Sequence, residues 1–313
     1  MKLISFHREF GPAEEAGILR EEGYVLPLAE TDLGIVTMND LFVKLAWKAE
    51  TGGDASQIGY FAPLVEAERK FLQNGGRLLS PAGCGKEGIR ILSPVPHPMQ
   101  DVICLGLNYT EHAEEAFGYD GVFTAEKAYP IFFSKRVSEA PGSGDPIPAH
   151  RDLTERLDYE NELGVILGRD ARDVAEEDAA KYIFGYTIVN DVSARDLQTR
   201  HKQWYFGKSL DGFTPIGPCI VTADEIAFPP RLAISTTVNG ELRQNSNTGM
   251  LIHGIAEIIS TLSRGMTLKA GTIIATGTPK GVVMGMEDLP FLKAGDRVVC
   301  SIEGIGELVN TVE

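Results

Sequence analysis

The run Asp158-Tyr159-Glu160-Asn161-Glu162-Leu163-Gly164-Val165-Ile166-Leu167 first alternates and then becomes continuously apolar. This pattern is typical of a β-strand whose second half is buried on both faces. On such a strand Glu160 and Glu162 share one face, and Tyr159 points to the other. Two neighbouring carboxylates repel unless a cation lies between them, and paired oxygen donors suit Mg²⁺, Mn²⁺ or Ca²⁺. A strand with one solvated face gives the same alternation, so this run leaves both interpretations open.

Short strands are predicted on both sides of this run, at 101–107, 184–189, 232–238, 242–244, 272–276, 297–302 and 307–312. Asn239-Gly240, between two of them, is a strong signal for a type I′ hairpin turn. A helix interrupts the strands, because apolar residues recur at helical spacing from Ile255 to Leu262. Many short strands with few helices favour a closed or rolled β architecture, and hence an α+β, mainly β fold.

The first ninety residues predict a separate, small α+β unit, residues 1–93. Its elements are short strands at 3–6 and 23–28, a helix through Leu41, Leu45 and Trp47 capped by Asn39 or Asp40, and a helix at 63–72. The run Ser93-Pro94-Val95-Pro96-His97-Pro98 follows, and three prolines in five residues continue neither a helix nor a central strand. We place the domain boundary there, which leaves residues 100–313 as the catalytic unit.

Composition excludes several classes of function. The 313 residues carry a net charge of -15 with a pI near 4.9, which argues against binding nucleic acid or an anionic membrane. The N-terminus lacks a secretory signal and no apolar run is long enough for a membrane helix. The four cysteines form no C-x-x-C pair. We therefore expect a cytoplasmic protein, in which an acidic ligand would need a metal or a local cluster of basic residues.

Two further segments place polar side chains near the end of an apolar run. In the segment 187–198, Asp191 follows a predicted strand and offers a third oxygen ligand. Arg195 and Gln198 face one pocket if a helix begins there, although a capped turn with a surface ion pair is the alternative. In the segment 207–218, Lys208 lies between small residues that permit close approach to a ligand, although a lysine on a surface loop is the more common case for this residue type.

A possible general base is found in Asn108-Tyr109-Thr110-Glu111-His112-Ala113-Glu114-Glu115. His112 and Glu115 share one face if this segment is helical. A carboxylate beside an imidazole raises its basicity and fixes its tautomer, as a base that activates water requires. A surface helix with a His–Glu contact is the alternative. The sequence contains no G-x-S-x-G motif, so it gives no support for a serine hydrolase.

In this order and at these separations, the segments resemble the fumarylacetoacetate hydrolase family. The resemblance covers residues 100–313, and the first ninety residues are similar to the smaller domain of the longer members. The matching runs are Gly106-Leu107-Asn108-Tyr109 with His112, 158–163, 190–196, Gly207-Lys208-Ser209 and Thr276-Gly277-Thr278-Pro279-Lys280-Gly281-Val282.

The resemblance implies the mixed β-roll fold of the family, a homodimer, and Mg²⁺ or Mn²⁺ held by Glu160, Glu162 and Asp191, with Ca²⁺ as an alternative. Asn108 stands where some relatives have an aspartate ligand, and we leave it out of the metal set. By the same resemblance, His112 with Glu115 activates a water on a lid segment at about 109–127, hinged at Gly118 and Gly121. Lys208, Arg195 and Gln198 stabilise the developing enolate, and Thr278 holds the substrate carboxylate.

Family members catalyse several reactions through a metal-bound enolate, so the metal residues do not discriminate among them. Hydrolysis needs an activated water, and the presence of His112 and Glu115 favours cleavage of a C–C bond in a small 2-oxo acid of the acylpyruvate or fumarylpyruvate type. The alternatives are an oxaloacetate decarboxylase or tautomerase and an isomerase of 2-hydroxyhepta-2,4-diene-1,7-dioate. A non-catalytic protein that binds small acids is a further alternative.

Overall fold

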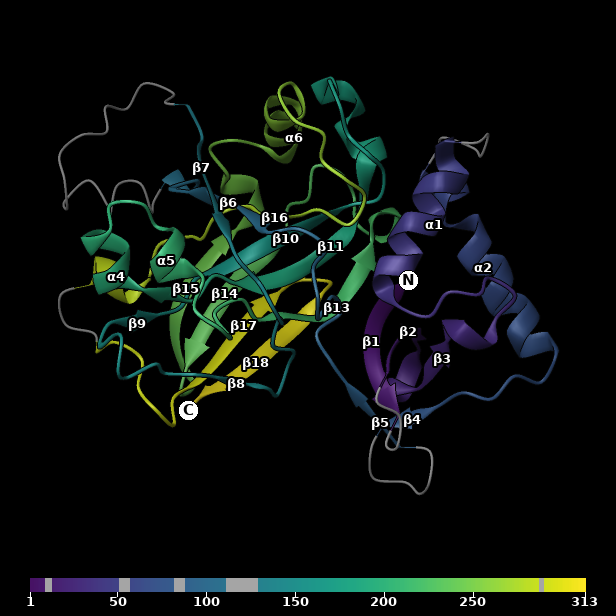
Figure 1. The fold of residues 1–313 in the computed structure, drawn as a ribbon, viewed down its shortest axis with the longest axis horizontal. Helices are drawn as coiled ribbons and strands as arrows, with labels where there is room; N and C mark the ends of the chain where they lie inside the picture. Colours follow the sequence, from purple (N-terminus) through teal and green to yellow (C-terminus); the bar gives the residue numbers. More distant parts are fainter. Residues whose placement is uncertain (9–12, 51–56, 82–87, 111–128, 287–289) are drawn as a thin grey trace.

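The computed structural model describes residues 1–8, 13–50, 57–81, 88–110, 129–286 and 290–313. Its strands form one large sheet, one smaller sheet and a two-stranded ribbon, with helices around them (Figure 1). The mixed, mainly β arrangement confirms the predicted fold class. The large sheet has the order β3 (Val25–Pro27), β2 (Glu14–Leu19), β1 (Lys2–Arg8), β13 (Ile216–Thr222), β11 (Ile183–Asn190), β10 (Asn161–Leu167), β16 (Ile273–Ala275), β6 (Val102–Gly106), β7 (Ile131–Lys135), with β5 (Gly88–Ile91) pairing β1 and β4 (Ser80–Pro81) pairing β5.

The smaller sheet packs against the large one. Its order is β15 (Glu241–Asn247), β14 (Ala233–Val238), β17 (Arg297–Ile302), β18 (Gly306–Val312), β8 (Pro146–Ile147), and the ribbon pairs β9 (Leu157–Asp158) with β12 (Ser193–Ala194). At the turn between β14 and β15, Asn239 and Gly240 have φ angles of 52° and 83°, as a type I′ turn requires. The predicted hairpin is confirmed.

The described α-helices are α1 (Met38–Glu50), α2 (Gln57–Gln73), α4 (Arg195–Arg200), α5 (Tyr205–Lys208) and α6 (Ile255–Ser263). Short 3-10 helices lie at Glu21–Gly23, Leu28–Glu30, Glu176–Tyr182, Ala223–Glu225, Thr248–Met250 and Val283–Gly285. The predicted helix at Ile255–Leu262 is confirmed as α6. In the described part of the chain, no helix has both the length and the apolar character that crossing a bilayer requires.

The two helices of the N-terminal segment begin earlier than predicted. Thr37, not Asn39 or Asp40, caps α1: its hydroxyl accepts a hydrogen bond from Asp40 N at 3.1 Å, and Asp40 Oδ2 accepts one from Thr37 N at 3.0 Å. This reciprocal pair is a capping box. Helix α2 was expected to start at Pro63, but Pro63 lies inside it. Buried Tyr60 and Phe61, on the preceding turn, keep that turn packed on the core despite the proline.

The N-terminal segment and the rest of the chain share one sheet. Strand β1 pairs antiparallel with β13, with Leu3 opposite Ile220. Figure 1 shows β1–β3 continuing the sheet beneath α1 and α2. The run Ser93–Pro98 lies between β5 and β6, and the predicted division into 1–93 and 100–313 remains a prediction. The shared sheet means that the N-terminal segment covers the edge that β13 would otherwise expose.

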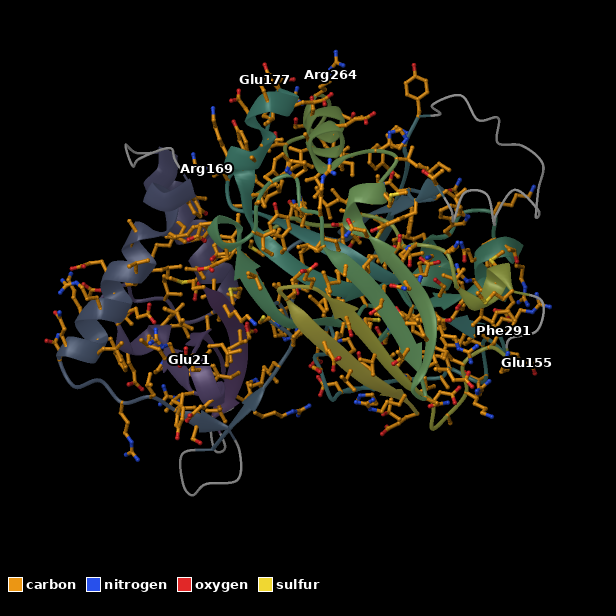
Figure 2. The ribbon with its side chains drawn as sticks, turned by 180° about the vertical axis from the view of Figure 1, so that it is seen from behind. Glu21, Glu155, Arg169, Glu177, Arg264 and Phe291 are labelled. Carbon is orange, nitrogen blue, oxygen red and sulfur yellow. The ribbon has the colours of Figure 1, made fainter. Side chains whose placement is uncertain are left out.

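An aromatic cluster joins the N-terminal helices to the large sheet. The ring of Phe184, on β11, has edge contacts with Phe42 at 5.0 Å, Phe61 at 5.5 Å and Tyr60 at 6.2 Å between centroids. The hydroxyl of Tyr60 also donates a hydrogen bond to the carbonyl of Gly168, directly after β10, at 2.6 Å. The guanidinium of Arg169, labelled in Figure 2, lies 5.0 Å from the Tyr60 ring centroid. Replacing one phenylalanine of such a cluster with alanine typically lowers the free energy of unfolding by about 3–5 kcal/mol.

Candidate active site

The pairing of β10 with β11 brings three acidic side chains together. The strands are antiparallel, with Asn161 opposite Asn190, so the residue before β10 and the residue after β11 lie at the same end. Glu160 and Asp191 occupy these positions, and Asp191 N donates a hydrogen bond to Glu160 O at 2.8 Å. Glu162, two residues along β10, completes the group. All positions of β10 and β11 are buried, and the apolar core fixes this end of the sheet.

The carboxylates of Glu160, Glu162 and Asp191 form a buried cluster, which we call the acidic triad. Their candidate ligand oxygens all lie within 4.8 Å of one another. The sequence prediction that these residues converge is therefore confirmed as geometry. Burial, followed by the charges of Asp191 and Glu160, raises the pKa of Glu162 well above its usual value. Three carboxylates in such a position need positive charge nearby if all are to be ionised.

Two buried lysines supply part of that charge. Lys208 Nζ donates hydrogen bonds to Glu160 Oε2 at 2.7 Å and to Asp191 Oδ2 at 2.8 Å. Lys135 Nζ, at the end of β7, donates to Asp191 Oδ1 at 2.5 Å and to Val192 O at 3.0 Å. Burial lowers the pKa of Lys208, but the charges of Asp191 and Glu160 outweigh it and the net direction is upward. Lys208 is therefore an ammonium group in this arrangement.

A buried arginine lies beside the triad. Arg195 begins α4, as the sequence suggested, and its Nη1 donates to Gln198 Oε1 at 3.0 Å on the next turn. Arg195 Nη1 is 2.6 Å from Glu160 Oε1, and its Nε donates to Asp158 Oδ2 at 2.8 Å. Asp158 Oδ1 in turn accepts a hydrogen bond from Val283 N at 2.9 Å. Asp158 thus holds the arginine against the triad and ties it to the loop after β16.

That loop also holds one triad member. Gly277 N donates to Glu162 Oε2 at 2.7 Å, and Gly277 has a φ of 99°, which favours glycine. The hydroxyl of Thr278 donates to Asn161 O at 3.0 Å and accepts from Gln244 Nε2 at 2.7 Å. The hydroxyl is therefore engaged within the protein, and the role of Thr278 in holding a substrate carboxylate stays a prediction.

The residues at the site fit a hard divalent cation. Glu162 Oε1 is buried and has no hydrogen-bond partner among the described residues, which is costly for a carboxylate oxygen unless a ligand satisfies it. Three carboxylates are ligands that Mg²⁺ and Mn²⁺ accept. If all of these carboxylates are ionised, Asp158 and the triad supply four negative charges against three positive charges from Arg195, Lys135 and Lys208. A divalent ion would change the excess from negative to positive and favour an anionic substrate.

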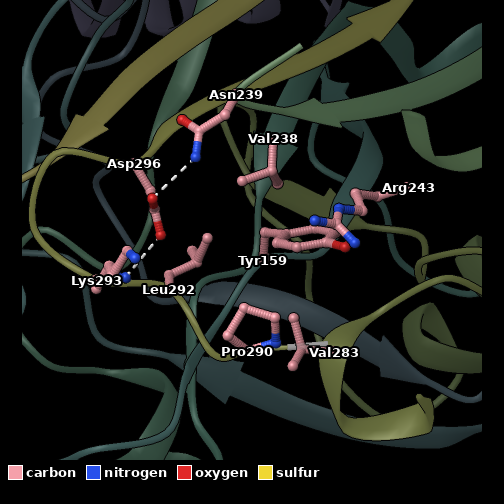
Figure 3. Close-up of a pocket in the computed structure, with 9 residues that line it drawn as sticks. All are labelled: Tyr159, Val238, Asn239, Arg243, Val283, Pro290, Leu292, Lys293 and Asp296. Carbon is pink, nitrogen blue, oxygen red and sulfur yellow. Dashed lines mark hydrogen bonds between the residues drawn. The ribbon is translucent and has the colours of Figure 1, made fainter. Parts of the chain in front are cut away.

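Tyr159 lies on the reverse side of the site, as the alternation of the strand predicted. Its hydroxyl donates to Gly281 O at 2.8 Å. Its ring lines a pocket of about 100 Å³ whose other walls are Val238, Asn239, Arg243, Val283, Pro290, Leu292, Lys293 and Asp296 (Figure 3). None of the triad residues lines this pocket. The Tyr159 side chain therefore faces this pocket, and the acidic triad lies on the other side of the chain.

Some functional residues were missed and others lie outside the described structure. Lys135 was not predicted, although a lysine directly after the apolar run Ile131-Phe132-Phe133-Ser134 is a detectable signal. Asp158 was also missed, although the alternation that pairs Glu160 with Glu162 extends back to it. His112 and Glu115, and the predicted lid with Gly118 and Gly121, fall in 111–128 and lie outside the described residues.

Comparisons with known proteins identify related chains. The family described as "Fumarylacetoacetate (FAA) hydrolase C-terminal" matches residues 101–313. The chain is 45% identical over 224 residues to oxaloacetate tautomerase YisK of Bacillus subtilis (strain 168), which covers 72% of this chain and 73% of that protein. Among solved structures, a fumarylacetoacetate hydrolase from Exiguobacterium antarcticum has 37% identity and a TM-score of 0.79, covering 100% of this chain and 99% of that one. A 2-hydroxyhepta-2,4-diene-1,7-dioate isomerase from Mycobacterium marinum has 29% identity and a TM-score of 0.69, with coverages of 100% and 98%.

Proposed function

Because this chain belongs to the fumarylacetoacetate hydrolase family, we propose that it is a divalent-metal-dependent enzyme that interconverts the keto and enol forms of oxaloacetate or a similar 2-oxo diacid. The observation that carries the proposal is the buried acidic triad bridged by Lys208. The 45% identity to an oxaloacetate tautomerase supports this substrate class. This choice ranks tautomerisation above the hydrolysis that the sequence had favoured.

The reaction sets clear demands on the site. In the keto-to-enol direction a proton leaves C3, another arrives at the 2-oxygen, and negative charge develops on that oxygen in between. A fixed cation near the oxygen stabilises this charge most strongly where water is excluded. Lys208 is a buried ammonium group, and we assign it this role. Arg195, held by Asp158, together with Gln198 would orient the carboxylates of the diacid.

The metal has one defined part in this proposal. Mg²⁺ or Mn²⁺, held by Glu160, Glu162 and Asp191, would act as a Lewis acid on the 2-oxo group. The buried protein residues would exclude water from the site and orient the substrate carboxylates. His112 with Glu115 is proposed as the proton carrier, on the basis of sequence spacing alone.

The test is the rate of oxaloacetate tautomerisation, followed by the decay of the enol absorbance with Mg²⁺ present. The protein should exceed the rate of buffer containing Mg²⁺, and a chelator should remove the difference. Glu160→Ala should lose both activity and bound metal. Glu155→Ala, which changes an exposed glutamate five positions earlier in the chain (Figure 2), is the matched control and should retain both. A wild-type rate equal to that of the Mg²⁺ blank would refute the proposal. Pyruvate formed in the same assay would reveal the decarboxylase alternative.

Hydrolysis of an acylpyruvate is the second candidate, and His112 and Glu115 are the observation that favours it. Cleavage needs a water activated by a base, whereas tautomerisation needs only a proton carrier. Acetylpyruvate should then yield acetate and pyruvate. His112→Ala should suppress this cleavage while it leaves part of the tautomerisation intact. An equal loss of both activities would argue against a water-activating role for His112.

A homodimer and a cytoplasmic location also remain proposals. The resemblance to the family supports the dimer. Light scattering of the purified protein should give twice the chain mass of 34.0 kDa. A monomeric mass at micromolar concentration would refute the dimer.

A further inference from the structure

Tyr109 carries a buried hydroxyl group that nothing in the described protein binds. The residue is 1% exposed, and its hydroxyl has no hydrogen-bond partner in the part of the chain that the structure describes. Leaving a buried hydroxyl unpaired costs free energy, and replacing it with a hydrogen would remove that cost. Such a group is a candidate for binding a ligand that completes its hydrogen bond.

The backbone around Tyr109 is fixed to the loop that holds Glu162. The side chain of Asn108 donates to Thr276 O at 2.8 Å and to His253 O at 3.1 Å, and its Oδ1 accepts from His253 N at 2.8 Å. A Cβ atom on Gly277 would lie 2.8 Å from Asn108 Cβ. Gly277 N is the donor to Glu162 Oε2. Tyr109 therefore directly follows Asn108, which packs against Gly277, and Gly277 in turn holds the carboxylate of Glu162.

The surroundings of Tyr109 differ from those of a core tyrosine. Although it is buried, it is not part of the contiguous hydrophobic core. Burial, and after it the charge of Glu162, raises the pKa of the Tyr109 phenol well above its usual value. The phenol thus stays protonated at neutral pH and can donate a hydrogen bond. Within the described residues Glu162 Oε1 also lacks a hydrogen-bond partner, and the charge of Glu162 acts on the Tyr109 phenol.

We propose that Tyr109 donates a hydrogen bond to an oxygen of the bound 2-oxo acid and is a substrate-binding residue of this site. A carboxylate or enolate oxygen is a better acceptor for a neutral phenol than any partner it has within the described structure. A protonated phenol is a poor metal ligand, since metal ligands bind in deprotonated form. This inference rests on the proposed function, because it assumes a 2-oxo acid as the ligand.

Tyr186 provides a matched control within the same chain. It is also fully buried, and its hydroxyl also has no hydrogen-bond partner among the residues that the structure describes. It lies on β11 inside the hydrophobic core, and burial alone raises its pKa. Removing either hydroxyl should leave the folded state as stable as before or slightly more stable. The two variants therefore differ only in whether a ligand uses the hydroxyl.

The experiment compares Tyr109→Phe and Tyr186→Phe with the wild type. Isothermal titration calorimetry measures the binding of oxalate, a stable planar analogue of a 2-oxo acid enolate, at saturating Mg²⁺. Mg²⁺ binding is measured separately without oxalate. Tyr109→Phe should weaken oxalate binding roughly 10- to 100-fold, as expected for a hydrogen bond to a charged group. Its Mg²⁺ affinity should be unchanged, and Tyr186→Phe should match the wild type in both.

Three results would overturn the inference. Tyr109→Phe could bind oxalate as tightly as the wild type, or it could lose Mg²⁺ and oxalate affinity together, which would indicate a role in shaping the metal site. A wild-type protein that binds no oxalate with Mg²⁺ would leave no acid for Tyr109 to hold. Failure of the proposed function is distinguishable, because it would appear as oxalate binding without turnover of oxaloacetate.

Discussion

The ammonium group of Lys208 lies 2.8 Å from Asp191 Oδ2, and both side chains are buried. The same ammonium group also donates a hydrogen bond to Glu160 Oε2 at 2.7 Å. One lysine thus bridges two of the three carboxylates that a divalent ion would share. Lysine and metal ion therefore stabilise the same carboxylates.

Lys208→Met should consequently make the protein more dependent on metal for stability. Without the ammonium group Glu160 and Asp191 each lose one buried partner and keep only Arg195 and Lys135, and the loss of one partner costs about 3–5 kcal/mol in comparable buried pairs. We expect a lower melting temperature in chelator than for the wild type, and a larger rise on adding Mg²⁺. Differential scanning fluorimetry measures both. Lys181→Met, which removes an exposed ion pair with Asp178, should behave like the wild type. An equal Mg²⁺-induced rise in melting temperature in the wild type and both variants would contradict the view that Lys208 and the metal ion stabilise the same carboxylates.

Lys135→Met should reduce metal affinity by roughly 10- to 100-fold, as losses of residues that orient metal ligands commonly do. Lys135 holds Asp191 Oδ1 at 2.5 Å in a fully buried pair. Lys269 holds Asp170 at the same 2.5 Å, but the lysine is 59% exposed. Lys269→Met is therefore the control that removes an ion pair of the same length at an exposed position. Such an exposed pair contributes at most about 1 kcal/mol to stability. Titration with Mn²⁺, followed by electron paramagnetic resonance, gives the affinities. Comparable losses in the two variants would argue against a role for Lys135 at the metal site.

Asn108→Asp should destabilise the fold without improving metal binding. The amide of Asn108 donates to two carbonyl groups, those of Thr276 and His253. A carboxylate would face both carbonyls as an acceptor and leave them unpaired, at a cost of about 1–3 kcal/mol. Chemical denaturation measures the free energy of unfolding, and calorimetry measures the Mg²⁺ affinity. A tighter Mg²⁺ affinity in the variant would show that this position acts as a fourth ligand.

Stability should fall as the pH rises above about 9. Burial raises the pKa of the Cys219 thiol from 9.0 to about 11 and that of Cys300 from 9.0 to about 12. At a pH between the ordinary thiol pKa and the raised pKa of the folded protein, the unfolded chain loses the thiol proton while the folded chain keeps it. The unfolded state then binds fewer protons, so rising pH stabilises it relative to the folded state. Each thiol contributes a slope of up to about 1.4 kcal/mol per pH unit.

Urea denaturation between pH 8 and 11 measures this slope. Cys219→Ala removes one of the buried thiols and should have a shallower decline than the wild type, whatever its stability at pH 8. A variant with an unchanged slope would exclude the Cys219 thiol as a source of the pH dependence.

Local patterns predicted much of the fold because they depend on neighbouring residues. The φ angles at Asn239 and Gly240 follow from the turn chemistry of that dipeptide. The start of α4 at Arg195 follows from the polar residues after an apolar strand. Pro63 shows the limit of such reasoning, because a locally unfavourable residue was retained inside α2 by packing around it.

The sequence by itself indicated which side chains could bind a cation, because the alternating run 158–163 predicts Glu160 and Glu162 on one face. Only the tertiary structure decided what surrounds them. Lys135 reaches Asp191 across 56 positions of sequence, and β1 joins β13 across more than two hundred. Such contacts arise from the burial of whole sheets, in which strand order and register are set by the summed packing of many residues, and no local pattern encodes that sum.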